Sequence, residues 1–275
     1  MSLVEHAPSG QHAIEHITKE LIIHQQVQYA MITRHHLSLV FICTLMLGIM
    51  VFPRELVLLC ILVTGSCIGT LLPDIQMKVS ANRIFLMPAW CLTRFSTVIC
   101  IPVMSRIYRT LLYEIPDCGD KRLTHSVPGI LIIAISVAVL SVVPVIVGWP
   151  APVPQFAVVF PLGVTIGLIL HLFEDACTRK GIAPLFPFST IRIAGSIRPC
   201  DRADSRIAQY HFHHCSMFVV IFVLHLVGLW PQSISVLLSL FALGSCLAMM
   251  VWFSDIRIET YYLPPENSRP AFPVP

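Results

Sequence analysis

The sequence predicts an all-α, multi-pass membrane protein, and three observations support this fold class. The chain of 275 residues is 56% hydrophobic and only 12% charged. An ordinary soluble domain carries about a quarter of its residues as charges, so this chain has too few to cover a water-exposed surface. Six long apolar runs and a one-sided distribution of basic residues complete the argument. The composition excludes a secreted disulfide scaffold, a disordered chain and a basic nucleic-acid-binding domain.

Each of the six apolar runs predicts a transmembrane helix, and together they cover residues 37–52, 55–72, 127–148, 156–173, 216–230 and 234–253. A helix needs about 20 apolar residues to cross the hydrocarbon core, and about 17 is a working minimum. The third, fourth and sixth runs meet this length comfortably, and the first and fifth are short. Segment 84–113 predicts interfacial amphipathic helices instead, because the arginines at positions 83, 94, 106 and 109 are unfavourable inside lipid.

Charge asymmetry predicts how the spans are oriented. The connections 73–126 and 174–215 carry seven and six basic residues, whereas the turns at 149–154 and 230–233 carry no charge and begin with tryptophan. Because positive loops stay in the cytoplasm, both basic connections are expected there. Six spans then leave both termini cytoplasmic, and we expect a multi-pass membrane protein.

The chain divides into three predicted parts. Residues 1–35 are polar and predict a helical N-terminal segment, and residues 36–255 form the transmembrane helical domain with a site at its cytoplasmic boundary. Residues 256–275 are rich in proline and predict a disordered tail.

Ionisable side chains gather at one predicted depth, the cytoplasmic membrane boundary. They are His36 at the start of the first run, Asp74 after the second, His125 before the third, and His171, Glu174 and Asp175 at the end of the fourth. His171 and Asp175 are four residues apart and therefore share one helix face. Nitrogen and oxygen donors together suit zinc, manganese or iron. Four separate spans delivering such groups to one depth predict a divalent metal site.

Two further patterns bear on this site. Gly65 and Gly69 in the second run, like Gly163 and Gly167 in the fourth, form small-xxx-small motifs that let transmembrane helices approach closely. Packing through these faces would bring Asp74 near His171 and Asp175. A second group, His211, His213 and His214, precedes the fifth run, where it either joins the site or lies in water at the interface.

The separated motifs resemble the YdjM-type family. The matching stretches are His36-Leu37, Leu71-Leu72-Pro73-Asp74, Leu123-Thr124-His125-Ser126, His171 to Gly181 and Leu185 to Ser189. Members of this family are described as inner-membrane-associated, metal-dependent hydrolases, and the family name carries a LexA-binding label. The resemblance implies a multi-pass protein of a prokaryotic inner membrane, with metal ligands at His36, Asp74, His125, His171 and Asp175. With these nitrogen and oxygen donors, zinc or manganese is the expected cofactor.

This sequence departs from the family pattern at two places. The usual Pro-Asp-x-Asp-His reads Pro73-Asp74-Ile75-Gln76-Met77, so that an Asp and a His are replaced. The usual His-Arg-Gly-x-Thr-His-Ser begins with Asp120 and has Arg122 in place of its glycine. The residues that remain are enough for one metal ion.

A hydrolase at this boundary would use these residues in distinct ways. Glu174 or Asp120 could accept a proton from water, and Lys121 and Arg122 would suit an anionic substrate. Thr124 and Thr178 could orient the metal ligands by hydrogen bonds. A site at headgroup depth favours a phosphoester or lipid-linked substrate at the inner leaflet.

Three other functions remain open from the sequence. The protein could bind a metal without catalysis, because Gln76 and Met77 replace family ligands. It could be a membrane scaffold whose basic cytoplasmic loops bind a soluble partner or anionic lipid. A transporter is a further alternative, although transporter sites usually lie near the midplane of the membrane. Membrane lipid is the expected partner in every case, and the net charge of +3 gives no reason to expect direct nucleic-acid binding.

Overall fold

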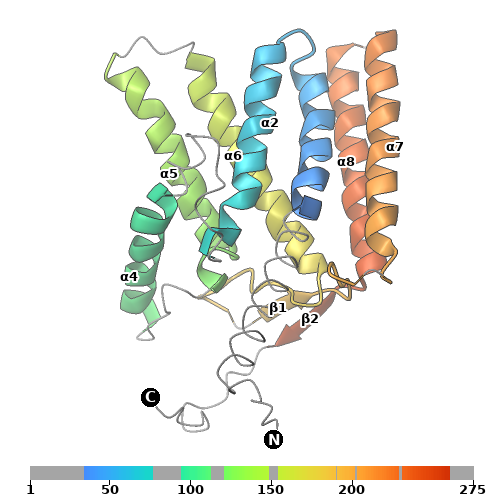
Figure 1. Cartoon of the computed structure of the whole chain (residues 1–275). Coiled ribbons are helices and arrows are strands. Elements are labelled where there is room, and N and C mark those ends of the chain that lie inside the picture. The colour runs from blue at the N-terminus through green and yellow to red at the C-terminus, as the bar shows by residue number, and fades with distance from the viewer. Residues whose placement is uncertain are drawn as a thin grey trace, which may run out of the picture.

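The computed structural model describes residues 34–76, 94–112, 121–148, 154–189, 191–201, 203–228 and 231–260. Five of the described helices are long and apolar enough to cross a membrane: Arg34–Val51, α5 (Val127–Ile146), α6 (Pro154–Cys177), α7 (Arg206–Val227) and α8 (Gln232–Ser254). A shorter apolar helix, α2 (Leu56–Leu71), lies beside α6 in the same bundle (Figure 1). The prediction of an all-α membrane bundle is confirmed. Each of the six predicted runs lies in one of these helices, five of which have spanning length, while α2 is shorter.

The outer surface of the bundle is apolar, as a lipid-facing surface must be. On α5 the side chains of Leu131, Ile135 and Val139 are 52%, 61% and 58% exposed, and their spacing of four residues places them in one stripe. Phe241 and Trp252 on α8 are also exposed.

Glycines bring α2 and α6 into backbone contact, as the sequence motifs predict. A methyl group at Gly69 would lie 2.1 Å from the carbonyl oxygen of Val164, and one at Gly167 would lie 2.0 Å from that of Ser66. No side chain fits at either position unless the helices separate. This close crossing holds the end of α2 against the end of α6.

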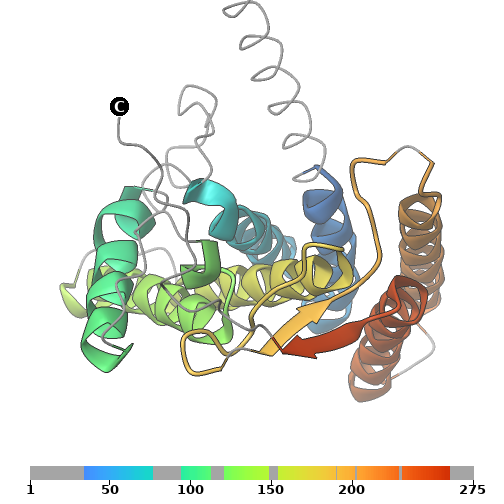
Figure 2. The same ribbon diagram turned by 90° about the horizontal axis from the view of Figure 1, so that it is seen from below.

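Short elements cover the lower end of the bundle in Figure 1, which is the predicted cytoplasmic end. They include the 3₁₀ turns η1 (Pro73–Gln76) and η4 (Lys121–Leu123), and an antiparallel pair of strands, β1 (Ile191–Ala194) and β2 (Arg257–Thr260). Figure 2, seen from this end, shows the two paired strands lying across the end of the helical bundle. Neither strand is among the elements predicted from the sequence, and β2 occupies the first part of the predicted disordered tail.

The amphipathic segment is helical where the structure describes it. A π-helical turn, η3 (Ser96–Cys100), leads into α4 (Ile101–Leu112), which buries Met104 and Tyr108 in the core shared with α5. Arg106 and Arg109 on its other face are exposed. This agrees with the predicted amphipathic character, and residues 84–93 lie outside the described part of the chain.

The fifth span begins earlier than the apolar run suggests. Helix α7 starts at Arg206 rather than near residue 216, so His211, His213 and His214 lie within its first turns. His214 is fully buried, and its Nδ1 lies 2.7 Å from the carbonyl oxygen of Tyr210. The expectation of a water-exposed histidine cluster before the span is therefore wrong for His214, because the helix continues through these polar residues.

A candidate metal centre at the predicted cytoplasmic end

Three potential metal ligands converge from three parts of the chain. Asp74 lies in η1 directly after α2, His125 lies between η4 and α5, and His171 lies in the last turns of α6. One donor atom from each residue lies within 4.8 Å of the others. Both histidines are buried and Asp74 is partly exposed. The sequence predicted that these three residues would meet, and the structure brings them together.

Local structure orients the His125 ring. Its Nδ1 lies 3.0 Å from the carbonyl oxygen of Lys121, and a carbonyl can only accept a hydrogen bond. With Nδ1 as the donor, Nε2 is presented to the centre of the cluster. The buried Thr124 donates from Oγ1 to the carbonyl of Pro73 at 3.0 Å, which fastens this loop to the turn that carries Asp74.

Asp175 supplies a fourth donor at short range. Its Oδ2 lies 3.3 Å from Nε2 of His125 and 3.6 Å from Nε2 of His171, while Nε2 of His125 is also 3.4 Å from Oδ1 of Asp74. Ligands about 2.1 Å from a tetrahedrally coordinated zinc ion are separated by about 3.4 Å. These three contacts therefore already have the spacing of metal ligands.

His171 provides the clearest sign that the cluster fits a metal ion. Its side chain is 1% exposed, and among the described residues neither Nδ1 nor Nε2 has a hydrogen-bond partner. Burying a polar group without a partner is unfavourable by about 1–3 kcal/mol, so such groups are rare in folded proteins. A metal ion bound at Nε2, the nitrogen 3.6 Å from Oδ2 of Asp175, would give that atom the partner it lacks.

The electrostatics of Asp74 also favour a bound cation. Burial alone would raise the pKa of its carboxyl group, but the neighbouring His125 and His171 rings outweigh burial and hold that pKa below its usual 3.8. Nζ of Lys121 lies 4.0 Å from Oδ1 of Asp74. The carboxylate is thus ionised at neutral pH, as a metal ligand must be.

His36 and Glu174 lie at the edge of the cluster, on the side of the first helix. Nδ1 of His36 is 2.5 Å from Oε2 of Glu174, and Nε2 of His36 is 3.4 Å from Oδ1 of Asp175. The His36 and His171 rings are neighbours, with centroids 4.7 Å apart. Sequence spacing places His171 and Asp175 on one face, but it gave no signal for a contact between residues 138 positions apart.

The other predicted site residues make contacts outside the group of metal-ligand candidates. The guanidinium of Arg122 lies 4.6 Å from the centre of the Phe186 ring, a cation–π geometry. Thr178 donates from Oγ1 to the backbone carbonyl of Asp175 at 2.8 Å, so it supports the end of α6. Asp120 lies outside the described residues.

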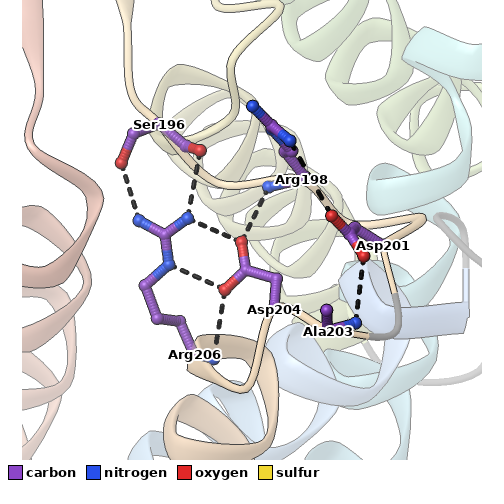
Figure 3. A pocket seen from close by; sticks show the side chains of 6 residues that line it. All are labelled: Ser196, Arg198, Asp201, Ala203, Asp204 and Arg206. Carbon is purple, nitrogen blue, oxygen red and sulfur yellow. Dashed lines mark hydrogen bonds and ion pairs between the residues drawn. The ribbon is translucent and has the colours of Figure 1, made fainter.

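A second polar cluster at this end is a structural clamp. Figure 3 shows Arg206 gripping Asp204, with Nη2 2.6 Å from Oδ2 and Nε 2.7 Å from Oδ1. Arg206 also donates to the hydroxyl and the carbonyl of Ser196 and to the carbonyl of Phe253. The Arg206 guanidinium holds the pKa of Asp204 down, at about 2. Because these groups satisfy one another, the clamp joins the connection after β1 to α7 and α8.

The fold and the site together define a multi-pass membrane protein with a buried His/Asp cluster at one end of its bundle. The family model for the YdjM inner membrane protein matches residues 31–256, and the chain belongs to that family. It is therefore a multi-pass protein of the inner membrane. No curated protein and no solved structure matches the chain.

Proposed function

We propose that this protein is a membrane-embedded, metal-dependent hydrolase that acts on a phosphoester or lipid-linked substrate at the inner leaflet. The observation that carries the proposal is the buried His171, which lacks a hydrogen-bond partner among the described residues and faces donors from two other segments. Asp74, His125, His171 and Asp175 would hold one zinc or manganese ion. A divalent ion there would act as a Lewis acid and activate water near neutral pH.

The residues of this chain would divide the remaining work. His125 and His171 would bind the ion through ring nitrogens, and the two aspartates would supply negative charge that draws the cation into a largely apolar bundle. Lys121, beside Asp74 and partly exposed, lies where it would attract a substrate anion. Arg122 would contribute to that attraction while stacked on Phe186. These positive groups favour a phosphoester over a neutral ester.

A carboxylate would serve as acceptor for the proton that water loses during hydrolysis. Of the two carboxylates that the sequence suggests, Glu174 is buried against His36 and is not one of the three tightly grouped donors. Asp120 directly precedes Lys121 in the chain, and we assign it the role of proton acceptor.

The test is a metal-dependent activity screen on protein purified in mild detergent. Zinc- or manganese-loaded protein is assayed with bis(p-nitrophenyl) phosphate and with phospholipid in mixed micelles, next to the variants His171→Ala and Asp120→Asn. We expect hydrolysis by the wild type and none by His171→Ala. Activity that survives His171→Ala would contradict the mechanism. Metal binding without hydrolysis of any substrate would instead support a non-catalytic metal protein. Salt-sensitive binding of anionic vesicles without metal dependence would support a scaffold.

A further inference from the structure

We infer that His36 and Glu174 do not bind the metal but form a brace that positions Asp175 as its fourth ligand, so that the centre has two imidazole ligands rather than three. The inference rests on the proposed metal site and assigns roles that the family resemblance does not: the resemblance implies that His36 is a ligand. Three geometric observations carry it.

The first observation is the position of His36 relative to the donors. The three tightly grouped donors come from Asp74, His125 and His171. Asp175 reaches this group through Oδ2, which lies 3.3 Å from Nε2 of His125 and 3.6 Å from Nε2 of His171. The nitrogens of His36 instead face Glu174 and the other oxygen of Asp175. Both ring nitrogens of His36 thus face carboxylates of α6. Nδ1 contacts Glu174 at 2.5 Å, and Nε2 lies 3.4 Å from Oδ1 of Asp175. A ring occupied on both sides in this way links two carboxylates.

The second observation is how the two oxygens of Asp175 are divided. Oδ1 faces His36, whereas Oδ2 faces Nε2 of both His125 and His171. Holding Oδ1 in place therefore aims Oδ2 at the site of the proposed metal ion. Outer partners of this kind, which fix the orientation of a ligand, commonly contribute a factor of about 10–100 to metal affinity.

The third observation is the burial of the brace. The side chains of His36 and Glu174 are 6% and 7% exposed, less than the 21% of Asp175. They join the start of the first helix to the end of α6 across 138 residues. Polar groups inside a membrane bundle have little water to bond with, so this pair holds its geometry firmly.

The ligand count is measured by X-ray absorption spectroscopy on the zinc-loaded full chain in detergent. Affinities for zinc are measured by competition with a chromophoric chelator. We expect two imidazoles in the wild type and still two in His36→Gln, with one zinc per chain and an affinity about 10–100-fold lower. His214→Gln removes another fully buried histidine, one outside the group of three tightly placed donors. As a matched control, it should leave zinc affinity unchanged.

Two variants of Glu174 separate positioning from general damage to the fold. Glu174→Gln keeps an oxygen that accepts from Nδ1 of His36 and should retain most of the affinity, whereas Glu174→Ala should lose it as His36→Gln does. Circular dichroism confirms that each variant is folded.

Specific results would overturn the inference. Three imidazoles in the wild type that fall to two in His36→Gln would make His36 a ligand, and the proposed metal site would survive. An affinity loss no larger than that of His214→Gln would show that no brace exists. A wild type that binds no zinc would overturn the metal site and the brace together.

Discussion

Replacing Gly69 with alanine tests whether the α2–α6 crossing sets the geometry of the metal centre. The new methyl carbon would lie 2.1 Å from the carbonyl oxygen of Val164, and an unstrained contact needs about 3.4 Å. The helices must therefore separate by about 1 Å. Strain of this kind typically destabilises a protein by about 1–3 kcal/mol. Because α2 leads directly into Asp74, the separation also moves this ligand away from His171.

We expect Gly69→Ala to lower the thermal midpoint in detergent and to weaken zinc binding by about tenfold or more. Gly244→Ala is the matched control, because a methyl group at Gly244 in α8 would meet no atom within 4 Å. Alanine there should be neutral, or stabilising by up to about 1 kcal/mol, since it favours the helix over glycine. Circular dichroism in chelator and a competition titration with zinc provide the two readouts. If both variants behave alike in both assays, the reasoning is refuted.

Three further predictions concern the clamp and the site. Asp204→Asn should remove about 1 kcal/mol of folding stability at pH 7 and so lower the thermal midpoint. Because Arg206 holds the pKa of Asp204 at about 2 when folded, below its ordinary 3.8, the difference from wild type should shrink as the pH falls from 3.8 towards 2. Thr124→Val removes the hydrogen bond to the Pro73 carbonyl and should weaken zinc binding and reduce stability by about 1–3 kcal/mol, and a neutral variant would contradict the role given to this contact. EDTA should lower the midpoint of the metal-loaded wild type, because bound ligand at 100 times its Kd stabilises a protein by about 2.7 kcal/mol, and it should have no effect on His171→Ala.

Hydropathy and charge predicted the helices well because lipid imposes a simple rule on them. The run at 127–148 became Val127–Ile146, and the small-residue motifs identified the α2–α6 crossing. The same rule failed at the start of α7, where nine residues from Arg206 to His214 are polar or mixed and yet helical. The strands β1 and β2 were not predicted, because a strand of four residues is too short to show a clear alternation of polar and apolar side chains.

For the site, too, local sequence patterns predicted some features and helix packing determined the others. Spacing along α6 correctly placed His171 and Asp175 together, and the common depth of Asp74 and His125 indicated that they would join them. The pairing of Glu174 with the first helix depends on how two helices pack, which no local pattern encodes. The sequence pattern therefore identifies which residues form the cluster but not which of them contact one another.

Metal content tests the central claim most directly. Wild type and His171→Ala are purified in mild detergent without chelator, soaked with zinc or manganese, and analysed by mass spectrometry for bound metal per chain. The account predicts about one ion per chain in the wild type and none in His171→Ala, with both proteins folded by circular dichroism. No bound metal in either protein, or equal amounts in both, would contradict it.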